Sequence, residues 1–403
     1  MRILLLDGAP PSTTHSGKSV RLLNLFRRLG KTHELHYLAI AGPADSQEVP
    51  VWLRELVASA KVWKRDEREF KLGRYVNWLA VRPWFYAPWR YPADYRNLSA
   101  DLRQWVRDEK VDIVHCFDEE VAQFVPDGLS CPWISDPADA MALHAARRGE
   151  QTQGFSEKLR WKSMAWRLGR YEEELVGRSH ATVFVSPIDA ACYSKNGHRE
   201  RIRVIPNGVD AEHFVPRCSS VPDAQVPTVL FTGHLSFEPN RDAARFLIDQ
   251  LFPKIRQVIP EAVCAIVGAD PTADLLAKHD GRSIFVTGRV DDLRPYFEKA
   301  GVYLCPMRLG AGIKNKLLEA MAMGKAIVTT SRGAEGLSFR DGEHLVIADD
   351  AEALVGRTLE LLRDAPKRDA LGRSARQLVL ERYSWDSAVQ EYESIYRRLH
   401  DGD

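Results

Sequence analysis

The amino-acid sequence predicts an α/β protein made of two doubly wound domains in tandem, each a parallel sheet with helices on both faces. Its 403 residues suit two domains of about 200 residues better than a single domain. Short apolar runs alternate with amphipathic stretches along nearly the whole chain, which is the pattern of repeated strand–helix units. The alternation weakens between residues 218 and 227, where serines and prolines indicate a linker.

The first domain is predicted over residues 1–205. An amphipathic stretch at 19–29 predicts a helix, and short apolar runs predict the strands of one sheet. These strand runs are 2–6, 34–40, 111–116, 132–135, 181–186 and 203–206.

The second domain is predicted over residues 206–384 and repeats the same pattern. Its longest amphipathic stretch, 241–258, predicts a helix. Its strand runs are 228–232, 262–267, 283–287, 301–305 and 326–330.

The final segment, residues 385–403, is predicted to be a helix that no further strand follows. Val389, Tyr392, Ile395 and Tyr396 recur at the spacing that places them on one helix face. We therefore expect this helix to bury that face against another part of the protein.

Charge and cysteine usage exclude several classes of protein. The formal net charge is +1, which gives no support to a whole-molecule nucleic-acid binder. The six cysteines include no Cys-x-x-Cys pair, so we interpret them as buried thiols of a reducing compartment. The apolar run 3–6 is too short for a signal peptide, and no run approaches the roughly 18 apolar residues of a membrane span. We expect a cytoplasmic protein that at most rests on the inner face of the plasma membrane.

The segment 307–324 carries the sharpest chemical pattern, a strand followed by a glycine-bearing loop and a helix. Gly310 and Gly312 allow a tight turn and a close approach of the backbone to a ligand. The helix N-terminus that follows favours a phosphate group, and Lys314 and Lys316 add two positive charges there.

Glu319 is the lone polar residue between Leu317 and Met323 on that helix. A carboxylate in apolar surroundings needs a partner, and its two oxygens can accept from the vicinal hydroxyls of a ribose. The alternative is a structural role, in which Glu319 bonds Lys316 one turn back or caps backbone amides.

Together with this segment, further stretches resemble the family 4 retaining glycosyltransferases, which have the GT-B fold of two Rossmann-like domains facing a central cleft. The resemblance spans nearly the whole chain, and within the family it points toward bacterial sugar transferases of exopolysaccharide pathways. The stretches are Val-Ile-Pro-Asn-Gly-Val-Asp at 204–210, Phe-Thr-Gly-His at 231–234 with Glu-Pro-Asn at 238–240, Ile-Val-Gly at 266–268, Val-Thr-Gly-Arg at 286–289, Tyr-Ser-Trp at 383–385, and Pro-Pro at 10–11 with Ser-Gly-Lys-Ser-Val-Arg at 16–21.

The resemblance implies that residues 206–384 bind a nucleotide-diphosphate sugar and that residues 1–205 hold a glycan, lipid-linked or small-molecule acceptor. It also implies that the helix of 385–403 packs back on the first domain, and it places the glycine loop around Gly17 on the acceptor side. The donor-binding residues that it implies are Glu319, Gly310, Gly312, Ile313, Asn315, Gly233, His234, Asn240, Gly288 and Arg289.

Three positions depart from the family pattern. A first glutamate, expected eight positions before Glu319, is replaced by Ala311, so contacts to the donor sugar must differ. An arginine and a lysine that the family places against the diphosphate are replaced by His234 and Asn240.

The lost positive charge can come from Lys314, Lys316, Arg289 or Arg308. We favour Lys314 and Lys316 as the catalytic cations, because they lie at the helix N-terminus next to the glycines. Negative charge grows on the nucleoside diphosphate as the glycosidic bond breaks, and oriented amides and ammonium groups stabilise it.

No metal or other cofactor is expected. The only Asp-x-Asp in the chain lies at its end, at 401–403, and the GT-B resemblance also implies a metal-independent reaction. The resemblance further implies hexosyl transfer with retention of anomeric configuration, in which the donor phosphate itself helps to deprotonate the acceptor.

Candidate acceptor-side residues follow two predicted strands of the first domain. Asp136 and Asp139 lie in Trp-Ile-Ser-Asp-Pro-Ala-Asp, and His115 ends the preceding strand. We favour Asp136 as a catalytic residue that orients a hydroxyl of acceptor or donor. The alternatives are an ordinary turn or N-cap aspartate and a packed histidine.

Residues 61–107 combine eleven Lys/Arg and five Asp/Glu with many aromatic side chains, and residues 158–170 repeat the combination on a smaller scale. Basic residues interleaved with aromatic ones can contact an anionic membrane surface or a lipid-linked acceptor. The alternative is a solvated basic face with its aromatic side chains in the core.

Two other functions fit the pattern less well. A GT-B-shaped sugar-nucleotide epimerase would share the two domains, and a catalytically silent nucleotide-sugar binder would explain Ala311, His234 and Asn240. A dehydrogenase is disfavoured because Gly8-Ala-Pro-Pro follows the first strand in place of Gly-x-Gly-x-x-Gly.

Overall fold

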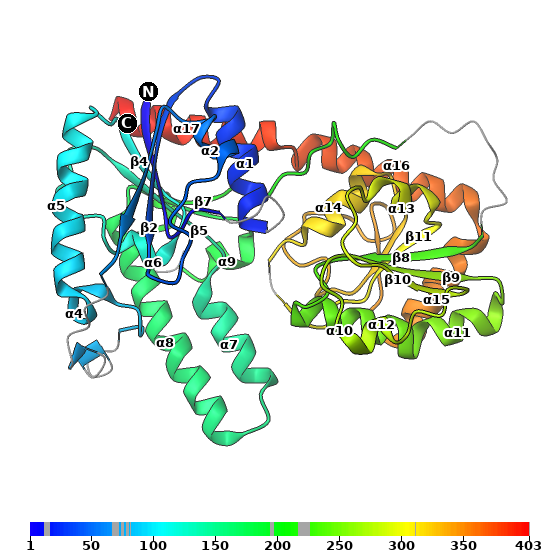
Figure 1. Cartoon of the computed structure of the whole chain (residues 1–403). Helices are drawn as coiled ribbons and strands as arrows, with labels where there is room; N and C mark the ends of the chain where they lie inside the picture. The colour runs from blue at the N-terminus through cyan, green and yellow to red at the C-terminus, as the bar shows by residue number, and fades with distance from the viewer. Residues whose placement is uncertain are drawn as a thin grey trace. The chain divides into compact units, whose positions relative to one another are not determined.

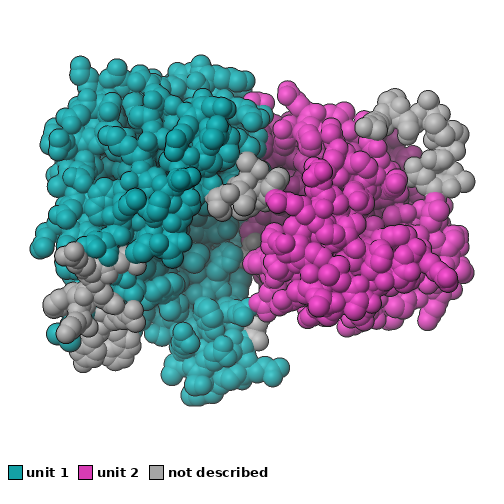
Figure 2. All heavy atoms as spheres, in the orientation of Figure 1, with its two compact units in different colours: residues 1–206, 388–403 teal, residues 207–387 magenta. Residues whose placement is uncertain are grey.

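The computed structural model of the chain forms two compact units, coloured separately in Figure 2. Unit 1 comprises Met1–Pro206 and Ala388–Asp403, and unit 2 comprises Asn207–Ser387. The chain therefore returns to unit 1 with its last helix. The structure describes residues 1–11, 17–66, 72–73, 76–77, 80, 82–193, 197–216, 226–310 and 312–402.

Unit 1 is built on a seven-stranded parallel sheet in the order β3-β2-β1-β4-β5-β6-β7 (Figure 1). The strand order reverses between β1 and β4, which makes that point the usual ligand position in a doubly wound sheet. The strands are β1 (Arg2–Asp7), β2 (Glu34–Ala41), β3 (Ser59–Lys64), β4 (Ile113–Cys116), β5 (Trp133–Ala138), β6 (Ala181–Phe184) and β7 (Ile202–Val204).

Helices cover both faces of the unit 1 sheet, with α5 and α8 on one face and α1 and α17 on the other (Figure 1). Helices α7 and α8 form an antiparallel pair whose tip extends away from the sheet (Figure 1). The helices are α1 (Gly17–Leu29), α2 (Val51–Arg54), α4 (Ala87–Arg90), α5 (Pro92–Asp108), α6 (Glu119–Ala122), α7 (Met141–Gln151), α8 (Phe155–Arg178), α9 (Pro187–Ala191), the 3₁₀ turn η1 (Arg199–Arg201) and α17 (Trp385–Asp401).

Unit 2 contains a six-stranded parallel sheet in the order β10-β9-β8-β11-β12-β13. Its switch point lies between β8 and β11. The strands are β8 (Thr228–Thr232), β9 (Val263–Val267), β10 (Ile284–Val286), β11 (Val302–Cys305), β12 (Ile327–Thr329) and β13 (Val346–Ile347).

In unit 2, α10, α11 and α15 lie on one face of the sheet and α14 and α16 on the other (Figure 1). The helices are α10 (Glu238–Phe246), the π-helical turn η2 (Leu247–Leu251), α11 (Phe252–Val258), α12 (Ala273–Leu276), α13 (Arg294–Lys299), α14 (Asn315–Ala322), α15 (Ala351–Arg363) and α16 (Ala365–Arg382).

Every strand predicted from an apolar run is present, and the predicted helix at 19–29 is α1. The helix predicted at 241–258 begins earlier, at Glu238, and contains the π-helical turn. Two strands were not predicted, β3 and β13, because both are edge strands with half-exposed side chains rather than apolar runs. The linker at 218–227 and Ala311 lie largely or wholly outside the described residues.

The final helix, α17, buries the face expected of it. Val389, Tyr392, Ile395 and Tyr396 are all buried. Four of the cysteines are buried free thiols, as predicted, whereas Cys192 is exposed because it caps the end of α9 at the surface.

Candidate functional site

Most of the predicted donor residues of unit 2, all except Gly288 and Arg289, lie in the loops and helices that follow the switch-point strands β8 and β11. Strand β8 continues through Gly233 and His234 into α10, and its neighbour β11 continues through the glycine loop into α14. Because the two loops leave adjacent strands at the same edge, their residues face one another. Open α/β sheets bind ligands at this place.

Gly310 and Gly312 shape the loop between β11 and α14. Their φ angles are +98° and +69°, in the left-handed region that favours glycine. A Cβ atom on Gly310 would lie 3.6 Å from the side chain of Pro239 and 3.7 Å from that of Lys314. The glycine loop therefore runs closely past the start of α10.

The N-terminus of helix α14 has no side-chain cap, because its N-cap residue, Lys314, forms no capping hydrogen bond. Its first turn contains no acidic residue. The buried Lys314 ammonium donates to the carbonyl of Gly312 at 2.5 Å, and the side-chain oxygen of Asn315 accepts from Asn207 at 3.3 Å. The N–H groups of an uncapped first turn and the positive end of the helix dipole attract anions.

Lys316 reaches from α14 across to the β8–α10 loop. Its ammonium donates to the side-chain oxygen of Asn240, and the Asn240 amide donates to the carbonyl of His234 at 2.9 Å. The ammonium also lies 4.8 Å from the ring centre of Phe231, and a Cβ atom on Gly233 would come within 2.9 Å of it. Burial lowers the pKa of Lys316, although Cys305 and Glu319 oppose the shift.

Glu319 lies one turn after Lys316 on α14, between the buried residues Leu318 and Ala320. The residue is half-buried, and within the part of the chain that the structure describes its carboxylate accepts no hydrogen bond. Burial raises its pKa to about 7, and the charge of Lys316 opposes that rise. The structural alternative, a bond to Lys316, is not formed because the ammonium is directed to Asn240.

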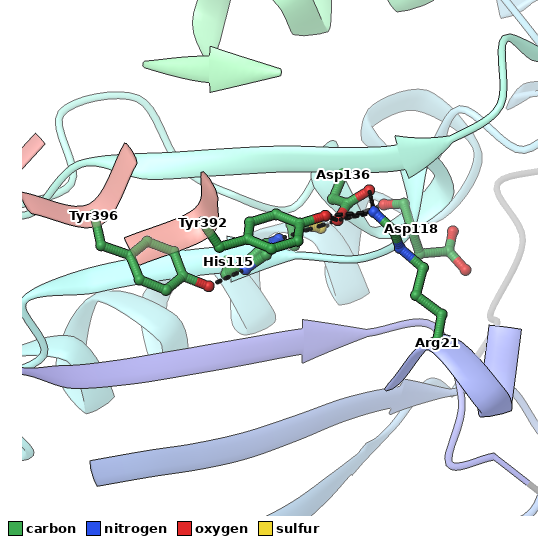
Figure 3. Close-up of polar contacts among 7 residues, drawn as sticks. Arg21, His115, Asp118, Asp136, Tyr392 and Tyr396 are labelled. Carbon is green, nitrogen blue, oxygen red and sulfur yellow. Dashed lines mark hydrogen bonds and ion pairs between the residues drawn. The ribbon is translucent and has the colours of Figure 1, made fainter. Parts of the chain in front are cut away.

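In unit 1, Asp136 lies within β5 at the centre of a buried network (Figure 3). Its carboxylate accepts from Arg21 at 3.2 Å and from the Tyr392 hydroxyl at 2.5 Å, and it lies 3.3 Å from His115 Nε2. Arg21 also bonds Tyr392, and His115 Nδ1 lies 2.7 Å from the Tyr396 hydroxyl. Desolvation raises the pKa of Asp136, but the Arg21 charge and the hydrogen bonds outweigh it and hold this pKa at about 2.

Comparison with known proteins places the chain in a family. The family described as "Glycosyltransferase Family 4" matches residues 15–213, and the family described as "Glycosyl transferases group 1" matches residues 226–364. A phosphatidyl-myo-inositol mannosyltransferase of Mycobacterium tuberculosis (strain CDC 1551 / Oshkosh) is 34% identical over 211 residues, 48% of this chain and 53% of the relative. The match thus spans about half the length of that relative.

A phosphatidyl-myo-inositol mannosyltransferase of Mycolicibacterium smegmatis is 30% identical over 320 residues, which cover 76% of this chain and 75% of the relative. The chain belongs to glycosyltransferase family 4. The solved structure of HepE from Anabaena in complex with UDP and glucose has a TM-score of 0.64 and 14% identity, and covers 98% of this chain and 99% of that chain. With its two parallel-sheet units, this glycosyltransferase has the GT-B fold.

Arg308 and Arg289 are the other two residues considered as sources of positive charge for the glycosyltransferase. Arg308 is paired with a carboxylate, and Arg289 follows an edge strand. Arg308 forms a two-point ion pair with Asp242, at 2.6 and 3.0 Å, and lies over the ring of Phe246. Gly288 and Arg289 are exposed after β10, an edge strand two positions from β8. Lys314 bonds the carbonyl of Gly312 in the glycine loop and Lys316 bonds Asn240, and their role as catalytic cations stays a prediction.

His234 does not simply replace a phosphate-binding arginine. Its Nε2 lies 3.0 Å from the carboxylate of Asp270, and its Nδ1 lies 2.9 Å from the hydroxyl of Ser236. Its side chain is more than half exposed. Ile313, in the glycine loop, belongs to the buried core of unit 2 and anchors the loop there.

The residues predicted on the acceptor side lie in different surroundings. Asp136 and His115 are fully enclosed and engaged with other side chains, and Asp136 lies in a strand rather than in the turn or N-cap considered as its alternative. Asp139 is partly exposed, 4.0 Å from His144. Gly17 is the first residue of α1, and the preceding loop residues lie outside the described part of the chain. Direct contact of these residues with an acceptor stays a prediction.

Sequence reasoning gave no separate role to Lys18, which lies at the switch point of unit 1. Its ammonium is 2.6 Å from the buried Asp7 carboxylate and 3.1 Å from Asp118, and the Tyr37 hydroxyl donates to Asp7 at 3.0 Å. Burial raises the pKa of Asp7 even though Lys18 opposes it. The Gly-Lys pair of the stretch at 16–21 was the available signal for this cluster.

Most described aromatic side chains of residues 61–107 are packed inward. Phe85 and Tyr91 belong to the core of unit 1, whereas Trp84 is 48% exposed. The core interpretation therefore fits this segment better than an exposed aromatic surface. Among the described residues, no helix has the length and apolar character needed to cross a bilayer.

Proposed function

We propose that this protein transfers a sugar from a nucleotide-diphosphate donor to a glycan, lipid-linked or small-molecule acceptor, with retention of anomeric configuration. The observation that carries the proposal is the position of Lys316. Its ammonium lies at the switch point of unit 2 beside Gly233, next to the uncapped N-terminus of α14. A cation and a helix N-terminus at one place suit a diphosphate.

The chemistry that we propose follows from where charge develops. Breaking the glycosidic bond leaves negative charge on the β-phosphate of the donor. The α14 amides and the Lys316 ammonium stabilise that charge without reorganisation, because Asn240 already holds the ammonium in place. Lys314, bonded to Gly312, holds the glycine loop in the conformation that presents those amides.

Glu319 is proposed to accept hydrogen bonds from the ribose hydroxyls of the donor. This half-buried residue lies one turn after Lys316, and none of the described residues bonds its carboxylate. A ribose bound there would lie next to a diphosphate at the start of the same helix. Uracil nucleotide donors have support from the complex of HepE with UDP and glucose, and a lipid acceptor has support from the names of the mycobacterial relatives.

Three finer features belong to the same proposal. The reaction uses no metal, because amides and Lys316 take the role of the counter-cation. The donor phosphate accepts the acceptor proton, which is compatible with the Asp136 carboxylate being enclosed and engaged. The protein acts at the cytoplasmic face of a membrane, with residues 61–107 near the acceptor.

A thermal-shift panel of UDP-, GDP-, ADP- and dTDP-sugars tests the donor class first, since a ligand of the folded state raises apparent stability. The donor that stabilises the protein is then incubated with glycan and lipid acceptors, and the anomeric configuration of the product is read by NMR. Transfer with retention supports the proposal. An epimerised donor without acceptor would instead indicate an epimerase, and binding without turnover a silent binder.

A further inference from the structure

The side of α8 that faces away from the core of unit 1 carries large apolar side chains where a soluble helix carries polar ones. Phe155, Leu159 and Trp166 are 84%, 59% and 56% exposed. Their spacing places all three within about 40° of one another around the helix axis. The opposite side of α8 carries Leu168 and Tyr171, which are buried in the core. We call the three exposed residues the α8 stripe.

Cations flank the α8 stripe. Lys158, Lys162 and Arg170 are exposed on the same side of the helix, and the guanidinium of Arg170 lies 5.9 Å from the ring centre of Trp166. Residues 141–170 as a whole contain seven Lys/Arg and two Asp/Glu. This excess of positive charge lies on a helix pair that extends away from the sheet (Figure 1).

A groove of about 470 Å³ lies beside the stripe and shares Leu159 with it. Its walls combine arginines with apolar side chains, namely Arg82 and Trp84 on one side and Arg160 and Arg167 of α8 on the other. Arginine binds phosphate groups well, and the apolar walls can take the first part of an acyl chain. The lining therefore fits an amphipathic anion.

We propose that the α8 stripe and the neighbouring groove dock this protein on an anionic phospholipid bilayer. The stripe inserts at the boundary of headgroups and acyl chains, and the flanking cations bind lipid phosphates. A second copy of the chain is a poorer occupant, because pairing of two stripes would bring two sets of cations together. The proposal centres the membrane contact on α8, and residues 61–107 contribute the groove wall formed by Arg82 and the exposed Trp84.

Vesicle flotation of the full chain tests this docking. Two vesicle types are compared, phosphatidylcholine alone and phosphatidylcholine with part replaced by phosphatidylglycerol. We expect binding to the anionic vesicles only, weakened by added salt because exposed charges are screened. Replacing Lys158, Lys162 and Arg170 by Gln should weaken binding by about a hundredfold. The triple variant Phe155→Ser, Leu159→Ser and Trp166→Ser should weaken it by at least about tenfold.

A matched control replaces exposed apolar residues of unit 2, Val258→Ser with Leu380→Ser, and should float like the parent protein. Donor-induced thermal shifts should be equal in all variants, which separates this proposal from the proposed function. Failure of the parent to bind anionic vesicles would overturn the docking proposal. So would parent-like binding by both α8 variants, or a change in self-association by the stripe variant without a change in vesicle binding.

Discussion

The ammonium group of Lys316 on α14 donates a hydrogen bond to the side-chain oxygen of Asn240 on α10. The orientation of that amide is fixed from its other end, because its nitrogen donates to the carbonyl of His234 at 2.9 Å. An asparagine at a position where the family carries a basic residue thus holds a cation that comes from another helix. At the proposed diphosphate site, the positive charge is therefore moved, not lost.

Asn240→Asp tests this relationship. The aspartate keeps the shape and the bond to Lys316 but adds a negative charge next to the proposed diphosphate. We expect donor affinity to fall by on the order of tenfold to a hundredfold, measured by calorimetry. Asn240→Ala removes the partner without adding charge and should cost less affinity. Equal affinities for parent and Asn240→Asp would show that no phosphate lies near this side chain.

Glu319 should link donor binding to proton release. Its pKa is raised to about 7, so roughly half of the carboxyl groups carry a proton at neutral pH, and ribose hydroxyls bind the ionised form. Calorimetry in buffers of different ionisation enthalpy should detect about half a proton released per donor bound at pH 7. Affinity should fall as the pH is lowered from 8 to 6. No dependence on the buffer would contradict the ribose assignment.

Glu319→Gln separates binding from stability. It should weaken donor binding by on the order of tenfold to a hundredfold, because a charged acceptor is lost. Since the folded-state pKa is raised, the contribution of Glu319 to stability is present below its unfolded pKa and is lost as pH rises through about 7. The variant should therefore be more stable than the parent at pH 8. The exposed Glu261→Gln should change neither property.

Asp136→Asn should loosen the attachment of α17 to unit 1. The change leaves Arg21 buried without its counter-charge, which costs about 3–5 kcal/mol in comparable pairs. Because the pKa of Asp136 is lowered to about 2, its contribution to stability is present above its unfolded pKa near 4 and is lost as pH falls toward 2. Hydrogen exchange of α17 should accelerate at neutral pH in the variant. As a control, Asp127→Asn breaks the exposed ion pair with Arg178, and hydrogen exchange of α17 in this variant should match the parent.

Chelation tests the proposal that the reaction needs no metal. Sugar transfer by protein dialysed against EDTA should be as fast as transfer by undialysed protein, because we propose that backbone amides and Lys316 stabilise the leaving diphosphate. Loss of activity that is restored by added Mg²⁺ or Mn²⁺ would contradict this part of the proposal.

The sequence predicted the strands and the glycine loop because both are local patterns. Buried parallel strands read as continuous apolar runs, and Gly310 and Gly312 mark a turn that only glycine adopts easily. Edge strands such as β3 lack that pattern because neighbours cover only part of them. Side-chain partners were beyond sequence reasoning, because Lys316 and Asn240 are distant in the chain and only the sheet order brings their loops together.

The network around Asp136 illustrates the same limit. The aspartate was singled out for its place after a strand, where a site residue is expected. Its partners Arg21 and Tyr392 come from the first and last helices of unit 1, so burial and pairing decide its role in the structure. A pattern in sequence marks the residue, and the topology determines what it contacts.

The turnover of Lys316→Met tests the central claim most directly. Methionine has an unbranched side chain of similar length and removes the ammonium, whose nitrogen lies 4.8 Å from the ring centre of Phe231, so we expect the fold to be retained. With the donor identified by the thermal-shift panel, kcat should fall by about 10²–10³ relative to the parent, as for loss of one group that stabilises developing charge. Lys278→Met, which removes an exposed lysine paired with Asp249, should keep the parental rate. A Lys316→Met enzyme that turns over as fast as the parent would contradict the account.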